Sequence, residues 1–392
     1  MSGRHASRLR LAKENRRRRN KRKAVRMLLI GLATLVLVYF TGIYGNSLAF
    51  FGDFLSSGMT LVQFGDGWPV EMDLSGFRQA EEMGTAVVVL TDDQLLAYSP
   101  TAKQIMSYSH SMSDPVMVSS PYRTVIYDMN DTTFKVMNGH NLLFQQEMDS
   151  GIVHIAISDY NRLAVTTHSS SFNGEVTVFN YNMNKRFTWY CANGYPIYSS
   201  LSSNGKKLAV STAYSDGGLL KSRAFVIDSS KGEELFSIDD GNWPMRMIFL
   251  RENELLICYS GKLVLWDVSK QRQSAEYDLD GYLQAVDFHN SKIAVVSGSL
   301  DEKRPSTLVV LDSRLQERGA VRQSRGARSV MVDRSRVYVL TPSGLLEYDK
   351  DLNLVGEQST GKLSKTLVDY RGGILVDSTR LRKIEKTKSG EN

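Results

Sequence analysis

The sequence has little cysteine and lacks the short motifs that identify several enzyme classes. Its 2 cysteines among 392 residues cannot form a disulfide framework. No complete GxxxxGK(S/T), GxGxxG, HExxH or GxSxG pattern occurs, and these are the signatures of phosphate-binding loops, dinucleotide sites, zinc proteases and serine hydrolases. An apolar content of 42% excludes wholesale disorder. The chain is therefore a folded protein without any of these catalytic signatures.

Partial matches to known motifs fall in predicted turns or miss an essential residue. The segment GEQSTGK at 356–362 is followed by Leu363 where a magnesium-binding hydroxyl is needed, and Ser203 and Lys206 match SxxK inside a strand-to-strand turn. Five histidines outside the N-terminal segment do not have the spacing of a metal pair: His110, His140, His154, His168 and His289. We expect no catalytic residue, no cofactor and no metal site.

Basic residues are concentrated at the N-terminus. Residues 1–26 hold twelve of the 48 Lys and Arg residues and one acid, so the rest of the chain has 36 basic and 41 acidic residues. The formal charge of +6 describes this tail, and the folded part is mildly acidic. Because the tail has no aromatic residue to stack on bases, we favour contact with anionic lipid over nucleic acid. The predicted topology-setting and lipid-contacting residues are Arg16, Arg17, Arg18, Arg19, Lys21, Arg22, Lys23 and Arg26.

Residues 27–44 form an uncharged run directly after the basic tail. As a helix this run would be about 27 Å long, close to the roughly 30 Å of a bilayer core. Basic residues stay on the cytoplasmic side of a span. The sequence therefore predicts one transmembrane helix with a cytoplasmic tail at 1–26, a juxtamembrane linker at 45–60 and an extracytoplasmic remainder. Cleavage as a signal peptide after Ala49 is the alternative, although the run is longer than the usual apolar region of roughly 7–15 residues.

From residue 61 onward, short apolar runs alternate with polar turns, and no run shows a convincing helical period. Spacings of 36 to 48 residues between successive units are typical of four-stranded propeller blades. The sequence therefore predicts an all-β fold, a β-propeller over residues 61–386 with eight blades (seven is the alternative), and a disordered tail at 387–392. The units open near Phe77, Pro115, Gly151, Pro196, Pro244, Gly281, Ala327 and Leu363.

The last unit contains three strands, whereas the segment GWPVEMDL at 67–74 precedes the first full unit and looks like an orphan fourth strand. We expect residues 61–76 to complete the last blade, because this pairing closes the ring and removes two sheet edges. Three units are longer through insertions at 168–175, 214–222 and 298–306, between second and third strands. Insertions on one face of a repeat array often bind partners, and drift in loop length explains them equally well.

Two segments resemble known propeller families. LVLWD at 263–267 is similar to the end of the third strand in WD-type repeats. SSNGKKLAVST at 202–212 is similar to the first-to-second-strand turn of WD-type and pyrroloquinoline-quinone-type propellers. With the basic tail and single anchor, the chain resembles membrane-anchored propeller proteins of unknown function in Gram-positive bacteria. This resemblance implies a fold more than a function.

Aromatic residues lie where connections between blades are predicted to enter first strands: Tyr195, Tyr198, Trp243 and Tyr282. Such residues suit binding of a peptide or glycan, and packing between blades is the other explanation. The sequence predicts a non-catalytic, membrane-tethered extracytoplasmic scaffold that binds a protein or a cell-wall polymer. The alternative is a polysaccharide lyase or hydrolase that acts on cell-envelope glycans with acidic residues from several blades. Cys191 and Cys258 fall in non-neighbouring blades, so we expect two buried free thiols.

Overall fold

The computed structural model describes residues 30–32, 34, 48–360 and 364–385. The predicted basic tail, most of the predicted transmembrane run and the predicted C-terminal tail therefore lie outside the described residues. Within the described ranges, no helix is both long and apolar enough to cross a membrane.

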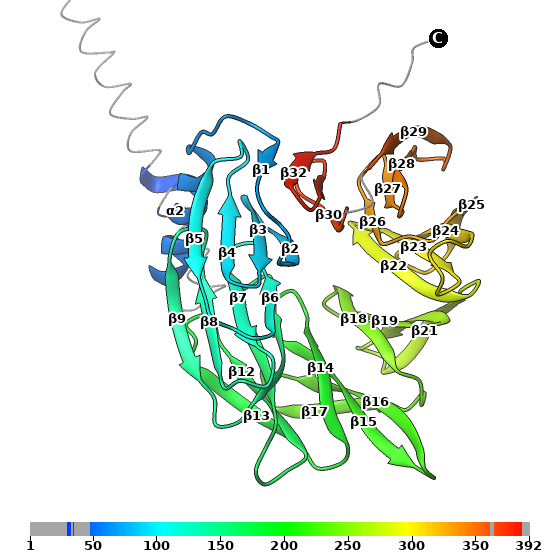
Figure 1. The fold of residues 1–392 in the computed structure, drawn as a ribbon. Helices are drawn as coiled ribbons and strands as arrows, with labels where there is room; N and C mark the ends of the chain where they lie inside the picture. Colours follow the sequence, from blue (N-terminus) through cyan, green and yellow to red (C-terminus); the bar gives the residue numbers. More distant parts are fainter. Residues whose placement is uncertain (1–29, 33, 35–47, 361–363, 386–392) are drawn as a thin grey trace, which may run out of the picture. The chain divides into compact units, whose positions relative to one another are not determined.

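The chain divides at Gly52 into two compact units, Met1–Gly52 and Asp53–Asn392. The second unit contains eight four-stranded antiparallel sheets among its described residues (Figure 1). These sheets are the blades of a β-propeller, which confirms the predicted all-β fold and the prediction of eight blades. Each of blades 1 to 7 consists of four consecutive strands, paired in chain order.

The strands of these seven blades follow the predicted units closely. Blades 1 and 2 contain β2 (Phe77–Met83), β3 (Ala86–Thr91), β4 (Gln94–Tyr98), β5 (Gln104–Ser109), β6 (Pro115–Ser119), β7 (Thr124–Asp128), β8 (Thr133–Met137) and β9 (Leu142–Glu147). Blades 3 and 4 contain β10 (Ile152–Ile157), β11 (Leu163–Thr167), β12 (Gly174–Phe179), β13 (Lys185–Cys191), β14 (Tyr195–Leu201), β15 (Lys207–Asp216), β16 (Leu219–Asp228) and β17 (Glu233–Ile238). Blades 5 and 6 contain β18 (Pro244–Arg251), β19 (Glu254–Tyr259), β20 (Lys262–Asp267), β21 (Arg272–Asp278), β22 (Tyr282–His289), β23 (Lys292–Gly298), β24 (Ser306–Asp312) and β25 (Glu317–Gln323). Blade 7 contains β26 (Ser329–Val332), β27 (Val337–Leu340), β28 (Gly344–Tyr348) and β29 (Leu354–Ser359).

Blade 8 joins the two ends of the propeller. Its first three strands are β30 (Thr366–Val368), β31 (Ile374–Val376) and β32 (Arg380–Lys383), and its fourth is β1 (Val70–Glu71). In Figure 1 the blue β1 lies beside the red β32, and the register pairs Val70 with Leu381 and Glu71 with Arg380. The orphan strand predicted at 67–74 therefore completes the last blade, as expected.

Burial decreases from the inner strands to the outermost strand of a blade. All six residues of β3 are buried, whereas β5 alternates between exposed and covered positions. Neighbouring blades cover a second strand on both faces, and the fourth strand meets water on one face. The described core forms eight clusters, each of which joins two consecutive blades. One cluster contains Val87 of blade 1 and Val376 of blade 8, so apolar burial also closes the ring.

Turns alternate between two faces of the ring, because the strands of each blade run up and down in sequence. Turns that join first to second and third to fourth strands lie on one face. Adjacent blades bond there, since Ser203 Oγ donates to Asp159 and Ser202 Oγ donates to Glu252, both at 2.6 Å. Second-to-third-strand turns and the connections between blades lie on the opposite face. We call this opposite face the insertion face, because it carries the three predicted insertions.

The linker predicted at 45–60 contains a helix, α2 (Leu48–Leu61), which the sequence did not indicate. Asp53 of this helix bonds to Arg123 in the β6–β7 turn and to Tyr181 in the β12–β13 turn. Both turns lie opposite the insertion face, on what we call the helix face. The propeller therefore has a helix on one face and insertions on the other.

Candidate functional site

Large apolar side chains are exposed along the insertion face of blades 3 to 6. Their exposed fractions range from 38% at Trp243 to 77% at Leu300. All of them lie in an insertion, in a connection between blades, or in a strand end beside one. Single exposed apolar residues are ordinary, but a series of them on one face marks an interaction surface. We call this set the insertion-face surface: Phe172, Tyr190, Tyr195, Leu219, Leu220, Trp243, Met245, Tyr282 and Leu300.

The second insertion is a long hairpin that extends β15 and β16 of blade 4 (Figure 1). These strands pair without interruption to the last residues before the turn. Gly217 and Gly218 form the turn with φ values of 60° and 80°, which are left-handed values that favour glycine in two-residue hairpin turns. The turn presents Leu219 and Leu220, which are 67% and 64% exposed. Local geometry thus holds two apolar side chains in solvent.

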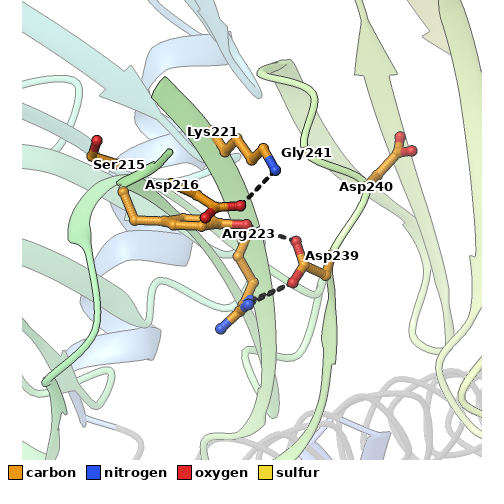
Figure 2. Close-up of a pocket in the computed structure, with 8 residues that line it drawn as sticks. Ser215, Asp216, Lys221, Arg223, Asp239, Asp240 and Gly241 are labelled. Atoms are coloured by element: carbon orange, nitrogen blue, oxygen red, sulfur yellow. Dashed lines mark hydrogen bonds and ion pairs between the residues drawn. The ribbon is translucent and has the colours of Figure 1, made fainter. Parts of the chain in front are cut away.

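A polar pocket of about 660 Å³ lies along this hairpin and the connection that follows blade 4. Asp239 lines the pocket and accepts hydrogen bonds from the Tyr214 hydroxyl at 2.9 Å and from Arg223 Nη2 at 2.5 Å (Figure 2). Lys221 Nζ donates to Asp216 at 2.7 Å. The residues that line the pocket are Tyr214, Ser215, Asp216, Lys221, Arg223, Asp239, Asp240 and Gly241.

Charge pairing in this pocket stabilises the ionised forms of its side chains. The hydrogen bond from Arg223 lowers the pKa of Asp239, and the hydrogen bond to Asp216 raises the pKa of Lys221. The Arg223 guanidinium also lies 5.1 Å from the centre of the Tyr214 ring. A general acid or base works best with a pKa near the working pH. The pocket is therefore suited to holding a polar or charged group of a partner rather than to transferring protons.

Three of the four aromatic residues singled out in the sequence belong to the insertion-face surface. Tyr195, Trp243 and Tyr282 are 60%, 38% and 51% exposed, at the start of blades 4, 5 and 6. Tyr198 lies apart from them, because it is half-buried on β14 with its ring centre 4.3 Å from that of His154. The basic residues predicted to contact lipid, at 16–26, are outside the described residues.

Three acidic side chains on first strands have raised pKa values: Glu81, Glu82 and Asp287. Desolvation raises the pKa values of Glu81 and Glu82 on β2 to about 7 and the pKa of Asp287 on β22 to about 6. Asp287 also accepts a hydrogen bond from the backbone of Val332 in the next blade at 2.8 Å. The sequence analysis singled out none of these three residues, although each occupies a strand that faces the interior of the ring. Their chemistry is that of carboxyl groups kept partly protonated near neutral pH.

His154 and His168 have separate hydrogen-bond partners, and both cysteines are buried. Cys191 and Cys258 are buried free thiols in blades 3 and 5, and burial raises their pKa values to about 11 and about 12. His154 Nδ1 is 3.1 Å from Ser199 Oγ, and His168 Nε2 is 3.5 Å from Asn130 Oδ1. Among the residues that the structure describes, His, Cys, Asp and Glu side chains do not gather in any group of three that could hold a metal ion.

The propeller matches a known protein family and resembles solved structures. The model of a family of unknown function (DUF5711) matches residues 68–384. No curated protein matches the sequence. Many solved structures share the fold. Sqt1 from Saccharomyces cerevisiae has a TM-score of 0.60 and 10% identity, with coverage of 83% of this chain and 100% of its own. BamB from Moraxella catarrhalis has a TM-score of 0.53 and 11% identity, with coverage of 82% and 100%. At these identities the likeness concerns the propeller fold.

Proposed function

The chain belongs to a family of unknown function, DUF5711, and we propose that it is a non-catalytic scaffold tethered to the cell membrane. Residues 27–44 span the membrane, residues 1–26 lie in the cytoplasm against anionic lipid, and the propeller lies outside the cytoplasm. A protein or a cell-wall polymer binds the insertion-face surface. The observation that carries this proposal is the series of exposed apolar side chains on one face of blades 3 to 6.

The chemistry of the insertion-face surface favours binding of a macromolecule. Aromatic and apolar anchors such as Tyr195, Trp243 and Leu219 supply the buried contact area on which affinity depends. The pocket beside them offers a paired Arg223 and Asp239 for polar groups of the partner. Phe172 and Tyr190 already contact each other, with ring centres 4.8 Å apart, so part of the surface is arranged before binding.

Membrane tethering is supported by the order of segments in the sequence. Twelve basic residues precede an uncharged run of eighteen residues, and basic residues are retained on the cytoplasmic side of a membrane span. The propeller follows this run. We expect a Leu219→Cys variant to react with a membrane-impermeant maleimide in intact cells. The native thiols are buried and serve as the internal control, since the unsubstituted protein stays unlabelled. Labelling only after cell lysis would contradict the proposed topology.

Partner binding is tested by site-specific crosslinking in membranes. A photo-crosslinking amino acid placed at Leu219 or Tyr282 should give a discrete adduct with a protein or a glycan polymer. The matched control is Leu142, which is exposed to 43% on the outer strand of blade 2 and should give none. Adducts of equal yield at Leu219 and Leu142, or no adduct at either insertion-face position, would rule out this surface as the binding site.

A second candidate function is hydrolysis or lyase cleavage of envelope glycans. It is favoured by the raised pKa values of Glu81 and Asp287, because glycosidases need a carboxyl group that stays protonated near neutral pH. The full chain in detergent would then degrade purified cell-wall glycan, and Glu81→Gln or Asp287→Asn would abolish the activity. Glu147→Gln, an exposed substitution on β9, is the matched control.

A further inference from the structure

Helix α2 has its polar side against the protein and its apolar side in solvent. Asp53, Ser56 and Thr60, spaced on one helical face, are exposed to 3%, 6% and 1%. The other sides of the helix and the short segment 62–64 after it carry apolar side chains with exposed fractions of 46% to 76%: Phe54, Leu55, Met59, Leu61, Val62 and Phe64. This is the reverse of a helix that packs on a soluble core, where apolar residues face inward.

The buried side of α2 is held by specific polar contacts. Asp53 Oδ2 is 2.7 Å from Arg123 Nε, and these two side chains are 3% and 5% exposed. The Tyr181 hydroxyl donates to the same carboxylate at 2.5 Å, and the Arg123 guanidinium lies 4.2 Å from the centre of the Tyr181 ring. One helix residue is thereby fixed to turns of blades 2 and 3 on the helix face.

A second set of contacts fixes the C-terminal half of the helix and the chain after it. His140, in the β8–β9 turn, places Nδ1 2.9 Å from Ser56 Oγ and Nε2 3.2 Å from Gln63 Nε2. The Gln63 carbonyl accepts hydrogen bonds from Ser99 and Thr101 in the β4–β5 turn, both at 3.1 Å. The apolar side of α2 is therefore presented by a rigid attachment, and its exposure is a property of the folded propeller.

Two features of the chain indicate a membrane as the occupant of this apolar side. The uncharged run ends at residue 44 and α2 begins at Leu48, so the connecting chain reaches at most about 14 Å. In addition, the helix-face turns of blades 1 to 4 expose more basic than acidic side chains. Lys103, Lys206 and Lys231 are exposed there, whereas Asp159 is the exposed acidic residue in these turns. Apolar contact combined with basic charge is how interfacial helices bind anionic membranes.

We propose that α2 lies in the headgroup region of the membrane and turns the helix face of the propeller toward an anionic bilayer. The inference rests on the proposed tether, because the span at 27–44 brings α2 to the bilayer surface. The span attaches the protein to the membrane, and α2 determines how the propeller is oriented there. Its apolar side chains enter the interface, its polar side holds blades 1 to 3, and the insertion-face surface is directed away from the membrane, where a partner can reach it.

Depth-dependent fluorescence quenching tests this orientation. The full chain is reconstituted in vesicles of phosphatidylcholine with phosphatidylglycerol, and an environment-sensitive fluorophore is attached to Met59→Cys or, separately, Phe64→Cys. Brominated lipids should quench both labels at least threefold. The same label on Leu219→Cys, an apolar position on the insertion face whose exposure of 67% lies between those of Met59 and Phe64, should stay unquenched. Circular dichroism checks that each labelled variant is folded.

The outcomes of this experiment distinguish the membrane tether from the orientation of the propeller. Failure of the chain to float with vesicles would overturn the tether and with it the orientation. Flotation with unquenched labels at both Met59 and Phe64 would leave the tether in place and overturn the orientation. Efficient Met59→Cys to Met59→Cys disulfide formation between chains would assign the apolar side to a second copy and overturn it as well. Loss of quenching in pure phosphatidylcholine vesicles would confirm the contribution of basic charge.

Discussion

Burial changes the acid–base behaviour of Glu81 and His154 in opposite directions. It raises the pKa of Glu81 to about 7 and lowers the pKa of His154 to about 4. Between pH 4.5 and 7 the unfolded chain has lost the Glu81 proton that the folded protein keeps, so folding stability falls as pH rises. Between pH 6.5 and 4 the unfolded chain binds a proton that folded His154 excludes, so stability falls as pH drops. Together the two residues favour a stability maximum on the mildly acidic side of neutrality.

Replacement of Glu81 by glutamine should remove the alkaline part of this dependence. The amide carries no charge to desolvate, so Glu81→Gln should have a higher melting temperature than the native protein at pH 8. The difference should shrink as pH is lowered and should be smallest below pH 4.5, where the native carboxyl becomes protonated in both the folded and the unfolded state. Calorimetry across this range gives the measurement. Melting curves that stay parallel at every pH, as expected for the exposed control Glu147→Gln, would contradict the raised pKa.

At the scale of secondary structure, the strands follow from the sequence and the helix does not. Blade strands alternate short apolar runs with turn residues, and this pattern is visible within four to seven residues. Helix α2 contains Gly52, Gly58 and two serines, and its buried residues are polar instead of apolar. Its stabilising partners Arg123 and Tyr181 are distant in sequence, so the local sequence pattern of residues 45–60 indicates only a linker. The exposed Tyr195, Trp243 and Tyr282 were singled out in the sequence because they lie where connections between blades enter first strands.

Loss of the buried charge on α2 should release the helix. Asp53→Asn leaves Arg123 buried without a carboxylate, and breaking a buried pair in this way costs about 3–5 kcal/mol. We expect hydrogen exchange of the amides of residues 53–61 to become much faster, while the blade strands stay protected. Asp66→Asn, at an exposed position after the helix, should leave exchange unchanged. Equal loss of protection in the blades would show that the pair stabilises the whole propeller.

Substitutions in the hairpin of blade 4 should weaken partner binding and leave the stability of the fold nearly unchanged. Leu219→Ser with Leu220→Ser removes two apolar side chains that are 67% and 64% exposed. Because exposed positions contribute little to folding, the unfolding free energy should change by no more than about 0.5 kcal/mol per substitution. Crosslinking to the partner from Tyr282 should nevertheless fall several-fold. Unchanged crosslinking with a marked loss of stability would assign these leucines to the fold instead of the binding surface.

Across the whole molecule, ring closure depends on one short strand and the core behind it. The sequence predicted eight units and a displaced fourth strand, because a closed ring leaves no free sheet edge. It could not indicate the orientation of side chains across blades, such as the Tyr370 hydroxyl that donates to the Thr85 carbonyl of blade 1 at 2.9 Å. Such contacts depend on the geometry of the completed ring.

Weakening the closure should destabilise the entire propeller. Leu381 pairs with Val70 of β1 and is fully buried, so Leu381→Ala should lower the free energy of unfolding by about 2–5 kcal/mol. The matched control is Leu354→Ala, at a leucine that is 53% exposed on the outer strand of blade 7. Urea unfolding followed by tryptophan fluorescence provides the measurement. Similar midpoints for both variants would contradict a structural role for the closure.

The positions of β1 and β32 in the chain also determine when the ring can close during protein synthesis. β1 (Val70–Glu71) leaves the ribosome about 310 residues before β32 (Arg380–Lys383), its partner in blade 8. At roughly 5–20 residues per second, this strand waits on the order of 15–60 s for its partner to be made. During that interval the sheet edges of the growing ring are unpaired. The nascent propeller therefore needs these edges to be shielded until the strands of blade 8 have been made.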